Sequence, residues 1–266
     1  MSFSIDGKTA IVTGAANGIG LAIARHFAAQ GANVMFADMD ESKLAEELGD
    51  VAEDSNIRYF SGDLREKLTL ANLLSGTIDA FDTVDILVNG SRQVLTTAPL
   101  DPDDDTVNTL LQQNLMTSLR LSQLVARRMI KQAKDKEEGP VGSIINLSSV
   151  AARRTRPELL AFSISTAALD QMTRSLAVAL APERIRVNSV AFGSVMSASL
   201  REVLKENREY RETIESITPL GRIAAPQEVA EAVQYLASDG SGFMTGQVLT
   251  VDGGRTLLDP VGPPAH

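Results

Sequence analysis

Three glycines near the N-terminus form a loop of the kind that binds the phosphates of a dinucleotide. Gly14, Gly18 and Gly20 follow a short apolar run and precede a helical pattern. Glycines permit a tight turn and let the backbone approach a pyrophosphate, which then faces the positive end of the helix. The spacing Gly-x-x-x-Gly-x-Gly differs from the commoner Gly-x-Gly-x-x-Gly, and glycine-rich turns also serve packing alone. Asn17 and Ile19 belong to the same predicted set of cofactor contacts.

A carboxylate at the end of the second predicted strand indicates which dinucleotide is bound. Asp38 lies eighteen residues after Gly20. A carboxylate at that point can accept hydrogen bonds from the hydroxyls of the adenosine ribose, and it repels a 2′-phosphate. Neither Arg nor Lys occupies residues 15–17 or position 39 to hold that phosphate. The sequence therefore predicts NAD in preference to NADP, the alternative being a solvated Asp at a strand end.

The elements that position these residues alternate along the chain between short β-branched runs and helical patterns. Several runs are apolar at consecutive positions, which is typical of strands covered on both faces. The pattern predicts an α/β fold, a single-domain Rossmann-type doubly wound parallel sheet of about seven strands with helices on both faces. The predicted strands are Thr9–Val12, Asn33–Ala37, Ile57–Ser61, Val84–Val88, Gly142–Leu147, Arg186–Ala191 and Val248–Val251. We expect one domain over residues 1–254 and a C-terminal tail over residues 255–266.

An acidic cluster at Asp101-Pro102-Asp103-Asp104-Asp105 is interpreted as the start of a helix. In this interpretation an Asp caps the helix, Pro lies in its first turn, and the acids face the positive end of the helix dipole.

Composition argues against several classes of function. A net charge of −9 argues against nucleic-acid binding, which usually shows a basic footprint. The absence of cysteine excludes disulfides, thiol catalysis and zinc thiolate sites, and no metal site is predicted. No apolar stretch reaches membrane-spanning length and no signal peptide is visible, so we expect a cytoplasmic protein without a membrane partner.

From about Gly7 to Gly254 the sequence resembles the short-chain dehydrogenase/reductase family. Beside the glycine loop, the matching segments are Asp63-Leu64, Gln113-Asn114-Leu115, Ser143–Ser149, Arg186–Val190, Pro219–Arg222 and Asp252–Gly254. The resemblance implies an NAD-dependent oxidoreductase that acts on a small carbonyl or alcohol substrate. It also implies a homotetramer or homodimer, formed through two of the helices and the last strand.

The resemblance assigns roles to several residues of the predicted site. It implies that Asp63 and Leu64 contact the adenine, and that Asn114 supports a proton-relay water. It implies that Ser149 polarises the substrate carbonyl. Asn89 and Gly90 correspond to cofactor contacts after the fourth strand, and Ser197 stands where a Thr often binds the carboxamide.

The family's central catalytic pair is missing from this chain. A Tyr-x-x-x-Lys motif normally lets the phenol exchange a proton with the substrate oxygen, while the Lys lowers the phenol pKa and holds the nicotinamide ribose. Thirteen residues after Ser149 the chain has Phe162, and the position of the Lys is Thr166. Phe cannot move a proton and Thr carries no charge, and loss of a general acid typically lowers a rate by about 10²–10⁴. The sequence therefore predicts weak or atypical activity.

Other departures cluster around the nicotinamide half of the site. The family pattern Asn-Asn-Ala-Gly is Asn89-Gly90-Ser91-Arg92 in this chain, so a bulky Arg92 replaces a glycine. The family pattern Pro-Gly after the sixth strand is Phe192-Gly193. The adenosine half is intact by comparison. Drift without a new function is the alternative explanation.

Four arginines are candidates for binding an anionic ligand. Arg153, Arg154 and Arg156 follow Ser149, and together with Arg92 they could hold a carboxylate or phosphate. The alternative is a solvated basic loop in an acidic protein. Tyr210 lies in the segment that corresponds to the family's substrate lid, residues 194–217, and could supply the missing acid; a packed lid residue is the alternative.

Three hypotheses of function follow. The first is an oxidoreductase with slow or unusual NAD-linked chemistry that uses Ser149 and Asn114. The second is a non-catalytic NAD-binding sensor or regulatory subunit. The third is a scaffold that pairs with an active relative and binds no cofactor.

Overall fold

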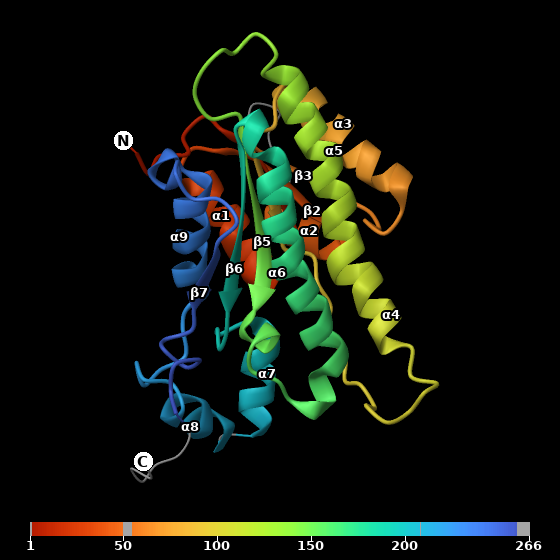
Figure 1. Ribbon diagram of the computed structural model, residues 1–266, viewed down its shortest axis with the longest axis vertical. Coiled ribbons are helices and arrows are strands. Elements are labelled where there is room, and N and C mark those ends of the chain that lie inside the picture. Colours follow the sequence, from red (N-terminus) through yellow and green to blue (C-terminus); the bar gives the residue numbers. More distant parts are fainter. Residues whose placement is uncertain (1, 50–54, 208, 260–266) are drawn as a thin grey trace.

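The computed structural model describes residues 2–49, 55–207 and 209–259. Seven parallel strands form one sheet in the order β3-β2-β1-β4-β5-β6-β7, with helices on both faces (Figure 1). The predicted doubly wound sheet is therefore confirmed. The strands are β1 (Thr9–Thr13), β2 (Asn33–Asp38), β3 (Ile57–Ser61), β4 (Ile86–Asn89), β5 (Gly142–Ser149), β6 (Ile185–Phe192) and β7 (Val248–Val251).

The chain reverses its direction of travel across the sheet at β1. It runs outward from β1 through β2 to β3, then returns to β4 on the other side of β1. In open α/β sheets such a switch point leaves a crevice outside the carboxyl ends of the strands, where dinucleotides bind. The fold therefore places the glycine loop after β1 and the loop after β4 side by side, at the carboxyl ends of two paired parallel strands.

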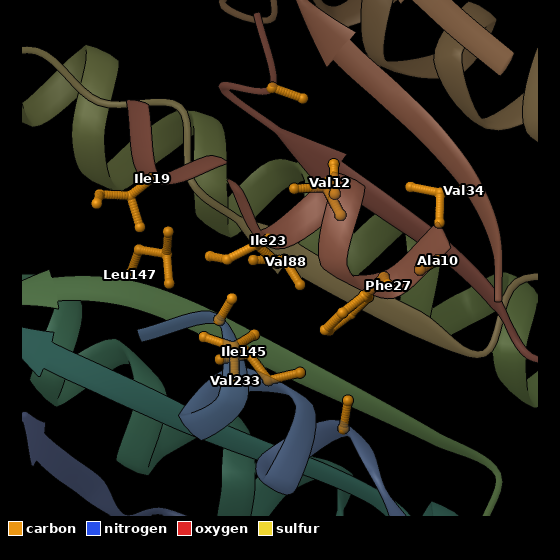
Figure 2. Packing of buried hydrophobic residues seen from close by; sticks show 14 of the residues in the cluster. Ala10, Val12, Ile19, Ile23, Phe27, Val34, Val88, Ile145, Leu147 and Val233 are labelled. Carbon is orange, nitrogen blue, oxygen red and sulfur yellow. The ribbon is translucent and has the colours of Figure 1, made fainter. Parts of the chain in front are cut away.

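Separate helix layers cover the two faces of the sheet because successive strand side chains point in opposite directions. Val12 belongs to one buried cluster and Ile11 to the other. Figure 2 shows the first cluster, in which Ile23 and Phe27 of α1 face Val233 of α9. The helices of this layer are α1 (Gly18–Ala29), α2 (Glu41–Leu48) and α9 (Pro226–Ala237). The other layer contains α3 (Lys67–Phe81), α5 (Thr117–Gln132) and α6 (Leu160–Leu180).

Two further helices lie beyond the carboxyl ends of β5 and β6 (Figure 1). These are α7 (Ala198–Glu206) and α8 (Glu209–Ser216), and both fall in the predicted lid segment. In the predicted tail, residues 255–257 form turns, whereas residues 260–266 lie outside the described part of the chain. No helix in the described ranges is long and apolar enough to span a bilayer.

The prediction that a helix starts in the acidic cluster at residue 101 is wrong. Helix α4 comprises Thr106–Leu110, and Asp105 precedes it without a side-chain cap. The Asp104 carboxylate instead accepts hydrogen bonds from the N–H groups of Ala98 (2.6 Å) and Thr106 (2.8 Å). Short acidic side chains that bond nearby backbone favour turns over helix, which explains why the helix begins later.

Candidate active site

The glycine loop is packed so tightly that side chains do not fit at two of its positions. A Cβ on Gly14 would lie 2.7 Å from the carbonyl oxygen of Gly90, and Gly14 has a φ of +71°. A Cβ on Gly20 would lie 2.1 Å from the carbonyl oxygen of Gly14. Asn17 precedes α1, and its side chain accepts no capping hydrogen bond from the first N–H groups of the helix. This glycine cradle at a helix N-terminus fits a pyrophosphate.

Thr13, which sequence reasoning missed, joins the glycine loop to the loop after β4. Its Oγ1 accepts hydrogen bonds from the N–H groups of Gly90 (3.0 Å) and Ser91 (3.1 Å). Asn89 is buried beside this junction and donates to Ser122 and Asn146. The sequence signal for Thr13 is a hydroxyl residue directly before the first glycine.

We expect Thr13→Val to destabilise the protein by about 2 kcal/mol, because it leaves two backbone N–H groups without their acceptor. Urea denaturation of the variant measures the change in the free energy of unfolding. Thr77→Val is the matched control, since the buried Thr77 hydroxyl donates to the carbonyl of Leu73 in its own helix. Equal stability of the two variants would show that Thr13 does not hold the junction.

Asp38 ends β2 with its carboxylate tied to the glycine loop. Its Oδ2 accepts a hydrogen bond from the N–H of Ala16 at 3.0 Å, and its Oδ1 accepts one from the N–H of Asp40 at 3.1 Å. The two bonds fix an anion beside the loop at the edge where an adenosine ribose is expected.

The predicted adenine-contacting pair follows β3. The Asp63 carboxylate binds the Arg65 guanidinium, whose Nε lies 2.9 Å from both carboxylate oxygens, and this ion pair lowers the pKa of Asp63. Leu64 is buried against the sheet.

The two α6 residues at the positions where the resemblance implies a Tyr and a Lys are buried. Phe162 is 5% exposed and packs against Leu110 and Ala151. Thr166 is 2% exposed, and its hydroxyl donates to the carbonyl of Phe162 at 2.9 Å. Ser149, at the end of β5, keeps a half-buried hydroxyl that accepts a hydrogen bond from the N–H of Ala151. Neither Phe162 nor Thr166 therefore offers a proton or a cation to a ligand at Ser149.

Asn114 lies in a π-helical turn, Leu111–Met116, between α4 and α5. Its Oδ1 accepts from the N–H of Gln93 at 2.8 Å, and its Nδ2 donates to the carbonyl of Gln93 and to Ser165 Oγ. Asn114 thus fixes the backbone directly after Arg92 against α6.

The Arg92 guanidinium lies between two aromatic rings. Its Cζ is 4.4 Å from the centroid of the Phe192 ring and 5.9 Å from that of Phe162. Its Nη1 donates to the carbonyl of Ser148 at 3.2 Å. Burial lowers the pKa of Arg92 to about 10, so the side chain remains charged at neutral pH.

The other three candidate arginines bind different partners from Arg92. Arg153 donates to Thr250 Oγ1 at 3.2 Å, and Arg154 donates to the carbonyl of Thr256. Arg156 forms an ion pair with Glu158. All three are exposed. A cavity of about 600 Å³ lies next to Arg153 and is lined in part by Ser194, Leu220, Asp252 and Thr256.

The predicted lid residues have structural partners or face solvent. Ser197 accepts a hydrogen bond from the N–H of Leu200 and so caps α7. Tyr210 is 52% exposed on α8.

Comparison with known proteins gives consistent matches over almost the whole chain. The family model described as enoyl-(acyl carrier protein) reductase matches residues 14–256. A 3-oxoacyl-[acyl-carrier-protein] reductase of Thermotoga maritima is 34% identical, with 95% of this chain and 99% of the relative covered. An uncharacterized oxidoreductase of Mycobacterium tuberculosis is 34% identical, with 96% and 94% covered. The crystal structure of a 7α-hydroxysteroid dehydrogenase with NADH and 7-oxo glycochenodeoxycholic acid matches with a TM-score of 0.85 at 30% identity, covering 95% of this chain and 96% of that one.

Proposed function

The chain belongs to the short-chain dehydrogenase/reductase family of oxidoreductases, and we propose that it binds NAD(H) mainly through the adenosine half, without the family's Tyr–Lys proton transfer. The observation that carries this proposal is the state of α6. Phe162 and Thr166 are both buried, and the Thr166 hydroxyl is bonded within its own helix. The site therefore has no general acid at the usual position and no cation one turn further on.

The adenosine half of the site supports nucleotide binding. Gly14 and Gly20 form a cradle that side chains would fill, and Asp38 presents a fixed carboxylate beside it. A related dehydrogenase structure contains NADH. When bound, NADH supplies a hydride; the part of this chain is to orient the nucleotide through backbone N–H groups and Asp38.

A second function, slow oxidoreduction of a small carbonyl or alcohol substrate, is supported by Ser149. Its hydroxyl remains half-exposed at the end of β5, where a water would have to deliver the proton. Turnover distinguishes the two functions, because a sensor or regulatory subunit binds NADH without oxidising it, whereas an oxidoreductase oxidises it. We also propose that the protein is cytoplasmic and forms a homotetramer or homodimer. Light scattering tests the oligomeric state.

Asp38 gives a sharp test of cofactor choice. We expect the wild-type protein to bind NADPH at least about tenfold more weakly than NADH, because the carboxylate repels the 2′-phosphate. Asp38→Asn removes the charge and should reduce this ratio to about threefold or less. Isothermal titration calorimetry with both nucleotides measures the ratio.

Asp40→Asn is the matched control, because Asp40 is the neighbouring acid that caps α2. It should leave the NADH:NADPH ratio unchanged. If neither nucleotide binds the wild-type protein, the proposed function is wrong and the scaffold hypothesis takes its place.

A further inference from the structure

Residues of three separate elements contact the planar, charged guanidinium of Arg92 at the carboxyl end of the sheet. The guanidinium stacks on Phe192 at the end of β6, lies 5.9 Å from the Phe162 ring on α6, and donates to the carbonyl of Ser148 in β5. Arg92 is not among the residues with positive φ, so the backbone needs no glycine at this position. The contacts with Phe192, Phe162 and Ser148 fix the position of the Arg92 side chain.

The location of Arg92 follows the path of a dinucleotide across the sheet. The glycine cradle and Asp38 lie at the ends of β1 and β2. A dinucleotide bound at the switch point extends from that half to the strands on the other side of β1. These are β4, which Arg92 follows, and β5 and β6, whose ends contain Ser148 and Phe192. The second half of the ligand is thus directed at the space that Arg92 occupies.

The chemistry of a guanidinium matches that of an oxidised nicotinamide ring. Both are planar and cationic, and both are attracted to the face of an aromatic ring. No carboxylate is paired with Arg92 in the parts of the chain that the structure describes. Its charge therefore also repels a second cation beside it.

We propose that Arg92 is an internal substitute for the nicotinamide ring, so that the site recognises the adenosine diphosphate part of a nucleotide and excludes the ring. The natural ligand is then ADP, ADP-ribose or NAD(H) with the nicotinamide outside the cleft. This inference rests on the proposed binding of the adenosine half. The proposed ligands are nucleotides that share the adenosine diphosphate part, and they need not form a redox pair such as NAD⁺ and NADH.

Calorimetric titration with ADP-ribose and NAD⁺ tests the inference on the wild-type protein. The two should bind with dissociation constants within about twofold of each other, because the ring adds no contact. Binding of NAD⁺ tenfold or more tightly than ADP-ribose overturns the inference.

Variants of Arg92 give the second arm of the test. Arg92→Ala opens the space and should strengthen NAD⁺ binding at least about tenfold relative to ADP-ribose, with the affinity for ADP unchanged. Arg92→Met removes the charge while retaining bulk and should give a smaller gain. Arg174→Ala, at an exposed arginine of α6 that bonds Gln171, should leave the ratio at its wild-type value. An unchanged ratio in Arg92→Ala contradicts the inference.

Binding of ADP separates the inference from the function on which it rests. If wild type and variants bind ADP but the NAD⁺ to ADP-ribose ratio does not depend on Arg92, only the inference fails. If wild type does not bind ADP, the proposed nucleotide binding fails and the inference fails with it.

Discussion

The triple variant Arg92→Gly, Phe162→Tyr, Thr166→Lys is expected to reduce a simple ketone with NADH about 10²–10⁴ times faster than the wild-type protein, because it supplies a proton donor and opens the space that Arg92 occupies. In that reaction a hydride passes from NADH to the carbonyl carbon, and the new phenol gives its proton to the carbonyl oxygen. The products are an alcohol and NAD⁺. Phe162 lies on the face of α6 that contacts Arg92 and Ala151, so a Tyr at this position points toward the end of β5.

On α6 both Phe162→Tyr and Thr166→Lys are needed, because an unperturbed Tyr titrates near pH 10. A nearby ammonium favours the phenolate and lowers that pKa. Phe162→Tyr alone should therefore gain less activity than the pair. The rate of loss of NADH absorbance measures each variant, and adding Ser149→Ala to the triple variant should remove most of the gain.

Arg92 is expected to limit this restoration. Because its guanidinium lies over the Phe192 ring, the double variant Phe162→Tyr, Thr166→Lys with Arg92 retained should gain much less activity than the triple variant. A double variant and a triple variant that both bind NADH and both remain inert would contradict this explanation. The inactive step would then lie elsewhere in the cleft, with Phe192 the first residue to test.

Gly20→Ala is expected to destabilise the protein by about 3 kcal/mol, at the upper end of the cost of overpacking. The added Cβ would lie 2.1 Å from the backbone carbonyl oxygen of Gly14, and backbone cannot move aside as a flexible side chain can. The variant should also lose nucleotide binding, because the same contact shapes the phosphate cradle. Urea denaturation and NADH titration measure the two effects.

Gly76→Ala is the matched control for Gly20→Ala. Gly76 lies inside α3, and a Cβ there meets no atom within 4 Å. This substitution should stabilise the protein by about 0.5–1 kcal/mol, since Gly costs that much relative to Ala within a helix. A Gly20→Ala variant as stable as wild type would show that the loop adjusts freely and that the glycine is not required.

The strands were predictable because parallel strands covered on both faces appear as short apolar runs. The residues at which the strands end were harder to predict. β5 continues through Ser148 and Ser149, where the apolar run has stopped, because these residues pair with Ala191 and Phe192 of β6. The start of α4 was mispredicted for a similar reason, since hydrogen bonds of Asp104 keep the acidic cluster in turns.

The resemblance implies which residues depart from the family pattern, but the sequence did not predict how these residues interact. Arg92 bonds the carbonyl of a residue 56 positions away and stacks on a ring that β6 supplies. Such contacts depend on the strand order. Arg92 and the three arginines after Ser149 were interpreted together as a candidate anion site, yet Arg92 has partners that Arg153 and Arg154 do not share.

A crystal structure of the wild-type protein grown with NADH tests the central claim most directly. We expect the adenosine diphosphate part over the glycine loop, with the Asp38 carboxylate within hydrogen-bonding distance of the ribose hydroxyls. We also expect the nicotinamide to lie away from Phe162 and Phe192, with Arg92 still between their rings. A fully ordered nicotinamide stacked on Phe192, or no nucleotide at the glycine loop, would contradict the account.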